Sequence, residues 1–163
     1  MNDTRNGRSS DPRAYPDRPF LAVSAAIVRD GKVLLVRRAR APANGLFSLP
    51  GGVVEAGETL HEAVVREIRE ETSITIEPIA LAGFRETVTR DSDHRVERHF
   101  VILPFAARWI AGEPNLSEEL SEARWVTPDV VEGLPTTPGL AEIVASAFEL
   151  LKARGNVALF RSR

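Results

Sequence analysis

Three glutamates, Glu67, Glu70 and Glu71, follow the i, i+3, i+4 spacing that places side chains on one face of a helix. Neighbouring like charges at this spacing repel by about 0.2–0.5 kcal/mol per pair in an isolated helix. A hard divalent cation bound by carboxylate oxygens reverses the sign of that interaction. The alternative is a solvated helix face on which Arg66 pairs with Glu62 and Glu70. The spacing favours a helix that binds a cation. The residues before and after the three glutamates help to decide between a cation site and a solvated face.

The helix that contains these glutamates is expected to begin near Thr59, because Thr59 and Glu62 have the spacing of a capping box. It is expected to continue to about Thr72. Its apolar stripe consists of Leu60, Ala63, Val64 and Ile68. The glycine pair at 51–52 lies shortly before it and allows the backbone to approach a ligand closely.

The same periodicity predicts how far each carboxylate is buried. Glu67 lies one turn after Ala63, so we expect it at the edge of the buried face. Glu70 and Glu71 are expected to point progressively toward solvent. This arrangement would hold an ion against the preceding loop.

The segment from Gly52 to Ile74 resembles the Nudix box, in which glycine, glutamate, an Arg-Glu pair and a Glu-Glu pair recur at fixed spacing. The residues that match that pattern here are Gly52, Glu58, Arg66, Glu67, Ile68, Glu70, Glu71 and Ile74. One position departs, because Ser73 stands where the family has its last glycine. The turn that ends the helix must therefore form without the residue that adopts a left-handed conformation most easily.

The resemblance implies a set of ligands and an activity. Glu67, Glu70 and Glu71 would bind Mg²⁺, or Mn²⁺ as a substitute, with the carbonyl of Gly51 as a further oxygen. A divalent ion in such a site neutralises phosphate oxygens and activates a water for attack on a diphosphate. The resemblance therefore implies a hydrolase of phosphoanhydride bonds.

Two further residues of the box would support the ligands. Arg66 would orient a carboxylate through charge-assisted hydrogen bonds. Glu58 would brace the loop against the helix or touch a metal-bound water. The general base stays open between a glutamate of the box and one in the acidic loop 112–122. In that loop Glu119 resembles the extra glutamate of relatives, and we favour it over Glu118 or Glu122.

Substrate contacts are expected from the strand over 32–38 and from the loop that follows it. Arg37 and Arg38 alternate between the two faces of that strand, so one of them must lie on the site side of the sheet. Arg38 is the first candidate for a phosphate contact and Arg37 the second, against a solvated strand end for both. Phe47 is a candidate for stacking on a base, with a place in the core as the alternative.

The resemblance implies an α/β Nudix fold, a mixed β-sheet sandwiched between helices. Strands are expected over Phe20–Val28, Lys32–Arg38, Ile74–Thr89 and His99–Trp109, with a hairpin at Asp30-Gly31. A final helix is expected from Thr137-Pro138. The predicted domain covers 20–156, between a mobile N-terminal tail at 1–19 and a C-terminal tail at 157–163.

Composition limits the partners. The net charge of −2 gives no bulk attraction to long nucleic acids or to anionic membranes, so a phosphate must be bound by local groups. No apolar run precedes Phe20, so neither a signal peptide nor a membrane span is expected. The absence of cysteine fits a reducing compartment, and the cytoplasm is the expected location. Relatives are frequently dimers, and the strand over 20–28 or the tail is the expected contact of a homodimer.

The substrate is a small nucleotide on this interpretation, with three alternatives. The first is a nucleoside diphosphate linked to another group, with ADP-ribose or a nucleotide sugar slightly favoured. Nucleoside triphosphates stay close behind, because relatives that act on ADP-ribose often have a proline well downstream of the box, and Pro78 is too near to fill that place. The third, of another class, is a Nudix-fold regulator that senses a nucleotide without cutting it.

Overall fold

The computed structural model describes residues 11–40 and 45–160, with the backbone alone for 156–160. The segment 41–44 of the expected loop before Phe47 lies outside the described residues, as do the ends of both predicted tails. The strands are β1 Phe20–Arg29, β2 Lys32–Arg38, β3 Phe47–Ser48, β4 Gly51–Val53, β5 Thr75–Leu81, β6 Arg85–Arg90, β7 Val96–Ala111 and β8 Leu120–Val126. The helices are α1 Leu60–Thr72, α2 Pro128–Val131 and α3 Leu140–Phe160.

The strands form one mixed sheet with β1 near its centre. The main order is β3-β2-β1-β7-β5, while β4 pairs with β1, β6 with β7 and β8 with β2. The β1–β7 pair is parallel and the other named pairs are antiparallel. Since β1 has strands on both sides, it offers no free edge for pairing with a strand of a second copy of the chain.

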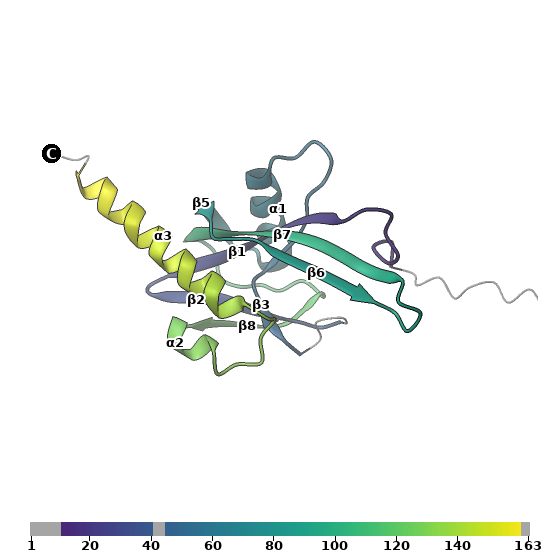
Figure 1. The fold of residues 1–163 in the computed structure, drawn as a ribbon. Helices are drawn as coiled ribbons and strands as arrows, with labels where there is room; N and C mark the ends of the chain where they lie inside the picture. The colour runs from purple at the N-terminus through teal and green to yellow at the C-terminus, as the bar shows by residue number, and fades with distance from the viewer. Residues whose placement is uncertain (1–10, 41–44, 161–163) are drawn as a thin grey trace, which may run out of the picture.

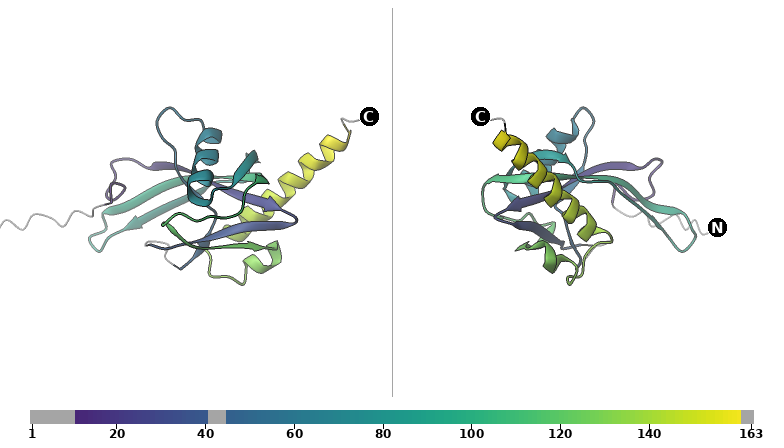
Figure 2. Two further views of the ribbon diagram at one scale, coloured as in Figure 1. Left: turned by 180° about the vertical axis from the view of Figure 1, so that it is seen from behind. Right: turned by 60° about the vertical axis from the view of Figure 1, so that its left-hand side comes forward.

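Helices cover both faces of this sheet (Figure 1). On one face Val23 and Ile27 of β1 pack with Val64 and Ile68 of α1 in a buried cluster. On the other face Ala26 of β1 belongs to a second cluster, which includes the buried side of α3. Alternation along a strand sends successive side chains to opposite faces, so β1 supplies both cores. The α/β fold with a sheet between helices is thereby confirmed, and Figure 2 shows the same layers from two further sides.

The long strand expected over Ile74–Thr89 is wrong, because the chain forms β5 and β6 with a break between them. At the break Gly83 has φ 144° and a β-carbon there would lie 2.8 Å from Cδ1 of Ile143. Glycine therefore lets the chain pass close to α3. A run of strand-forming residues does not reveal this break, because the cause is a helix far away in the sequence.

The final helix begins at Leu140, three residues after the expected N-cap. Gly139 has φ 73°, so Thr137 and Pro138 form the turn that precedes the helix rather than its first residues. The helix then continues through Phe160, which makes 157–160 helical and not a tail. No helix of the described residues is long and apolar enough to cross a membrane.

Part of the predicted N-terminal tail is held against the domain. The backbone N–H of Tyr15 donates to the carbonyl of Glu97 at 2.8 Å, and Asp11 pairs with Arg98 at 2.5 Å. Both partners belong to β7. Residues 11–19 therefore lie beside the β6–β7 hairpin, as the purple segment in Figure 1 shows.

Both ends of α1 have explicit caps. Thr59 is the N-cap and forms the predicted capping box with Glu62. Ser73 is the C-cap and adopts the left-handed conformation at φ 63°, ψ 10°, with its N–H donating to the carbonyl of Arg69. Serine thus makes the turn for which the Nudix box has glycine. With this C-cap, Glu67, Glu70 and Glu71 all lie within α1.

Ser73→Gly is expected to stabilise the protein. The left-handed conformation costs a residue other than glycine about 1–2 kcal/mol. Glycine avoids this cost, but it loses more conformational entropy on folding, which offsets about 0.5–1 kcal/mol of the gain. We expect the free energy of unfolding to rise by roughly 0.5–1 kcal/mol in urea titrations. Ser73→Ala is the control, since it removes the hydroxyl and keeps the backbone restriction. A Ser73→Gly variant that is no more stable than Ser73→Ala would contradict the assignment of strain to this turn.

Candidate active site

The site is built where the glycine pair of β4 passes between β1 and α1. Gly51 and Gly52 pair with Ser24 and Val23 of β1. A β-carbon on Gly52 would lie 2.4 Å from the carboxyl carbon of Glu67. The absence of a side chain at Gly52 therefore makes the space that the Glu67 carboxylate occupies. This close approach is to a side chain of α1, whereas the sequence predicted a close approach of the backbone to a ligand.

Arg66 connects three of the acidic residues. Its Nε and Nη2 donate to the two oxygens of Glu58 at 2.5 and 2.9 Å, and Nη2 also donates to the carbonyl of Val53 at 3.2 Å. Its Nη1 donates to Glu67 at 2.8 Å and to Glu70 at 3.2 Å. Because β4, the loop after it and α1 all contribute to these bonds, Arg66 fixes the loop to the helix. The expected bracing role of Glu58 and orienting role of Arg66 agree with this geometry.

These contacts shift the pKa values of the pair in opposite directions. Hydrogen bonds from Arg66 and from the backbone of Glu55 lower the pKa of Glu58 to about 2, and the pKa of Arg66 is raised in return. Both groups are therefore charged throughout the physiological range. The pKa of Glu67 is raised, mainly because its carboxyl is half-buried, although Arg66 opposes the shift.

Glu71 lies inside the protein, so the expectation that it points toward solvent is wrong. Only 4% of the residue is exposed, and its Oε2 accepts a hydrogen bond from the N–H of Gly51 at 2.9 Å. The reason is visible in the sequence, because Glu71 follows Val64 by two helical turns on the apolar stripe. Burial raises its pKa to about 7, while the charge of Arg38 acts in the opposite direction.

Glu70 is the exposed member of the three, with 60% of its side chain accessible. In the part of the chain that the structure describes, no three acidic or histidine side chains already surround a common point. The donor set nevertheless suits a hard divalent ion, since it consists only of carboxylate and carbonyl oxygens. The buried Glu71 carboxyl also lacks a full countercharge, as its raised pKa shows, and a cation would supply it. The residues present therefore fit a Mg²⁺ or Mn²⁺ site.

Arg38 lies on the site side of the sheet and Arg37 on the other. Nη2 of Arg38 is 3.4 Å from the carbonyl of Gly51, and Nη1 is 3.8 Å from Glu71. Arg37 instead pairs with Glu122 at 3.4 Å and stands over the ring of Phe47 at 4.5 Å. Of the two candidates for a phosphate contact, Arg38 is thus the one beside the glutamates.

Phe47 is a core residue, so its assignment as a base-stacking group is wrong. Its side chain is fully buried in the cluster beneath α3, on the face of the sheet opposite α1. Strand alternation explains the placement, because β3 pairs Phe47 with Arg37, and both face away from the site.

Glu119 lies at the edge of the site. Its carbonyl accepts a hydrogen bond from Ala39 at 2.9 Å, directly before Leu120 pairs with Arg38. The side chain is exposed, and its charge contributes to the raised pKa of Glu71. The favoured glutamate of the acidic loop is therefore close to the box, while Glu122 is occupied by Arg37 on the opposite side.

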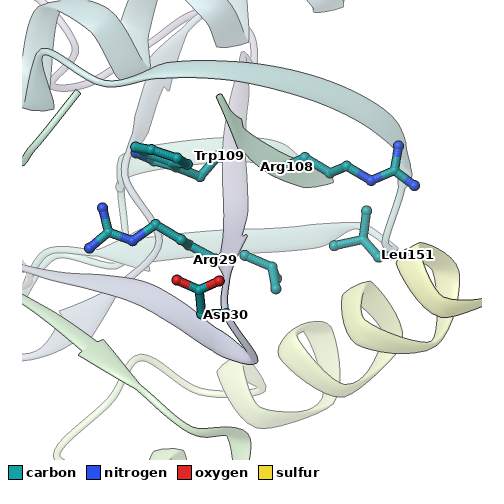
Figure 3. Close-up of a pocket in the computed structure, with 6 residues that line it drawn as sticks. Arg29, Asp30, Arg108, Trp109 and Leu151 are labelled. Carbon is teal, nitrogen blue, oxygen red and sulfur yellow. The ribbon is translucent and has the colours of Figure 1, made fainter. Parts of the chain in front are cut away.

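A cavity of about 320 Å³ lies elsewhere, between the far ends of β1 and β7 and α3. Figure 3 shows Arg29 and Trp109 on one side of it and Leu151 of α3 on the other. None of the candidate site residues lines it. Arg29 is already occupied by Glu113 at 2.6 Å. The cavity therefore takes no part in the site described above.

Glu71 gives the metal-free protein a specific pH dependence. Its folded pKa of about 7 lies above the ordinary value of 4.5, so the folded state binds a proton more tightly than the unfolded state. The stability that this proton supplies is complete below pH 4.5 and is lost as pH rises to about 7. We expect the melting temperature in EDTA to fall over this range, and the slope to be smaller in Glu71→Gln. Equal slopes in the two proteins would contradict the burial of a titrating Glu71.

The chain matches a known protein family over most of its length. A model of the NUDIX domain matches residues 18–147, which include all eight strands, α1, α2 and the first part of α3. The chain belongs to the Nudix family. The glycine turn, Arg66 and the glutamates of α1 therefore belong to the Nudix box of this domain.

Individual proteins are also similar to this chain. An ADP-ribose pyrophosphatase of Methanocaldococcus jannaschii is 39% identical over 107 residues, which are 66% of this chain and 61% of that protein. A MutT-like protein of Streptomyces ambofaciens is 38% identical over 125 residues, 75% of this chain and 74% of that one. The crystal structure of a MutT NUDIX hydrolase from Burkholderia pseudomallei matches with a TM-score of 0.67 at 31% identity, covering 80% of this chain and 98% of that one.

Proposed function

We propose that this Nudix protein hydrolyses the pyrophosphate bond of a nucleoside diphosphate linked to a second group. The observation that supports this most is the placement of Glu67 and Glu71 against Gly52 and Gly51, with Arg66 fixing the loop to α1. These two carboxyl groups and the Gly51 carbonyl offer the oxygen donors that a divalent ion prefers. Nudix hydrolases generally use such ions, and Mg²⁺, with Mn²⁺ as a substitute, is our proposal for this one.

When bound, the ion would neutralise phosphate oxygens and lower the pKa of a water that attacks phosphorus. The chain's own residues would do the rest. Glu67, Glu70 and Glu71 would hold the ion with the Gly51 carbonyl, and Arg66 would keep Glu67 in place. Arg38 would bind a substrate phosphate at the mouth of the site, exchanging its long contact to Gly51 for a phosphate oxygen.

Glu119 is our proposal for the general base. Its side chain is exposed, and its loop lies against α1, because the N–H of Ser117 donates to the carbonyl of Glu71 at 3.0 Å. A carboxylate with unhindered access to solvent can take a proton from the attacking water and release it to bulk solvent. Glu119→Gln is therefore expected to lower kcat with little effect on metal binding, which separates it from the ligands.

ADP-ribose is the substrate that we place first. The M. jannaschii relative is named for it, although the match spans less than two thirds of that protein. Other nucleotide sugars follow, then nucleoside triphosphates. We also propose the cytoplasm as the location, and a homodimer in which β1 does not pair with a strand of the partner.

A substrate panel tests the proposal. Release of nucleoside monophosphate or phosphate is measured from ADP-ribose, nucleotide sugars, dinucleoside polyphosphates and all nucleoside triphosphates, with Mg²⁺, Mn²⁺ or EDTA. We expect metal-dependent turnover of one class, with AMP and ribose 5-phosphate as the products from ADP-ribose. Nucleotide binding without metal-dependent turnover across the panel would overturn the hydrolase and favour a nucleotide sensor.

A further inference from the structure

The strand β6 lies at an outer edge of the sheet. β7 pairs with β1 along one side, and with β6 and then β5 along the other. Among the strands that the structure describes, β6 pairs only with β7. Figure 1 shows the β6–β7 hairpin extending past the helices at one end of the domain. In the described parts of the chain, the outer backbone groups of β6 therefore face no neighbouring strand.

The residues of β6 do little to protect this edge. The five residues 86–90 are exposed, and Val88 in their middle is 44% exposed. Natural proteins often prevent pairing with another chain by placing proline, lysine or a bulge on an edge strand. β6 contains neither proline nor lysine, and the extra residue of the bulge near its end is Glu97, which belongs to β7. Phe84, directly before the strand, is 71% exposed. The edge is thus open to a further strand.

Geometry restricts how two copies of β6 can pair with each other. Opposite residues of an antiparallel pair either exchange two hydrogen bonds or exchange none. Only every second residue of an edge strand directs its backbone groups outward, since the others bond to the inner neighbour. A symmetric pair must therefore be centred on a residue that lies opposite its own copy. Centres at Thr87, Val88 or Thr89 keep most of the strand in contact.

Of these three registers, the one centred on Val88 matches the charges. It places Glu86 opposite Arg90 of the second copy, twice by symmetry, and Thr87 opposite Thr89. Opposite charges and threonine pairs across neighbouring strands both stabilise a sheet. A centre at Thr87 would place Glu86 opposite Val88, and a centre at Thr89 would place Arg90 opposite Val88. β6 is therefore complementary to itself in one register.

Both charged residues can take part in such a pair. The side chain of Glu86 is 57% exposed, and its Oε1 is 3.1 Å from Nε2 of His99 on β7. Arg90 is exposed, and its Nη1 donates to the carbonyl of His94 at 3.0 Å. Each contact uses one atom of the charged group. The second carboxylate oxygen and the second terminal nitrogen can therefore meet across the edge.

We propose that two copies of this chain form a dimer through their β6 strands, paired antiparallel about Val88. The two sheets would join into one continuous sheet, with Val88 and both Glu86–Arg90 pairs on one face and the threonines on the other. Phe84 would lie against the β6–β7 turn of the second copy and lose part of its exposed surface. This contact gives the proposed homodimer a place on the molecule, and it does not depend on the hydrolysis reaction.

Charge reversal tests the proposed register. Glu86→Arg would place two arginines opposite each other at both ends of the pair, and Arg90→Glu would place two glutamates there. We expect each variant to dimerise about tenfold more weakly than the wild type, or worse, in sedimentation equilibrium. A one-to-one mixture of the two variants restores both opposite-charge pairs and should form heterodimers. Arg18→Glu is the control, because Arg18 is 84% exposed, lies outside β6 and undergoes the same change of charge as Arg90→Glu.

A thiol measures the register directly. The chain contains no cysteine, so Val88→Cys introduces a single thiol. In the proposed pair it lies opposite its own copy, with the β-carbons about 4.5–5.5 Å apart. Oxidation with copper phenanthroline should therefore link Val88→Cys as a disulfide dimer. Thr87→Cys should link far less, because it lies diagonal to its own copy at about 7–8 Å.

Several results would overturn the proposal. They are a wild type that stays monomeric at every concentration, a dimer that neither charge reversal weakens, a mixture that forms no heterodimer, and equal linking of Val88→Cys and Thr87→Cys. Turnover on the substrate panel is measured for the same variants and should equal that of the wild type, because neither Glu86 nor Arg90 belongs to the candidate site. A protein that dimerises as proposed but hydrolyses no nucleotide would refute only the proposed function.

Discussion

A Gly52→Ala variant is expected to keep its fold and lose its metal-dependent activity by about 10²-fold or more. The new methyl group would lie 2.4 Å from the carboxyl carbon of Glu67, which no real contact permits. The carboxylate can move because it is the end of a flexible side chain. A displacement of about 1 Å at a reacting centre costs on the order of 10²-fold in rate. Turnover and Mn²⁺ affinity are the measurements, with circular dichroism to confirm the fold.

Gly51→Ala is the matched comparison, and its effect should be on stability. Its β-carbon would lie 2.1 Å from the Val23 carbonyl oxygen and 2.6 Å from Cα of Ser24, both of them backbone of the central strand. Overpacking a core typically costs about 1–3 kcal/mol, and backbone neighbours that cannot turn aside place this variant at the upper end or beyond. If instead Gly52→Ala unfolds the protein, or retains full turnover, the close contact between Gly52 and Glu67 is not the one that positions the ligand.

An Arg66→Ala variant is expected to lose metal affinity by about 10–100-fold, the usual effect of removing a residue that orients metal ligands. Glu58 and Glu67 would lose their shared partner, and the loop after β4 would lose its bond from Arg66 to Val53. The pKa of Glu58, held at about 2 by Arg66, should rise toward its ordinary value. Titration by NMR and Mn²⁺ binding measure the two effects separately.

Arg66→Lys should recover little of this loss, because an ammonium group cannot reach Glu58, Glu67 and the Val53 carbonyl with one planar fork. Arg69→Ala is the control on the same helix, since Arg69 is exposed and in the last turn of α1. Arg66→Ala that binds Mn²⁺ as tightly as Arg69→Ala would show that Arg66 is not needed to orient the ligands.

The parts of the site predicted correctly are those that depend on local spacing. The capping box of Thr59 and the approach of the glycine pair to α1 follow from residues close together in the sequence. The burial of Glu71 was available from the same periodicity, because its position two turns after Val64 outweighs the usual exposure of a glutamate. The expectation that Glu71 faces solvent was derived from the register of Glu67 with Ala63, and the register of Glu71 with Val64 determined the outcome.

The parts that were missed depend on contacts between distant segments. The placement of Phe47 beneath α3 depends on which face β3 presents when it pairs with β2, and no residue beside Phe47 indicates that face. Nothing in the sequence indicates that the segment 11–19 lies against β7, since a polar segment with prolines is typical of a mobile tail. It is fixed through Asp11 to Arg98, 87 residues away.

The central claim is that the α1 glutamates bind the divalent ion on which hydrolysis depends, and Glu70→Gln tests it most directly. Glu70 is 60% exposed, so the substitution should leave the fold intact. Turnover of the best substrate of the panel is measured together with Mn²⁺ binding, with Glu62→Gln as a control on the same helix. Loss of turnover by about 10²-fold or more and weaker Mn²⁺ binding in Glu70→Gln alone are the predicted results. Metal-dependent turnover and Mn²⁺ affinity equal to those of the wild type would contradict the claim.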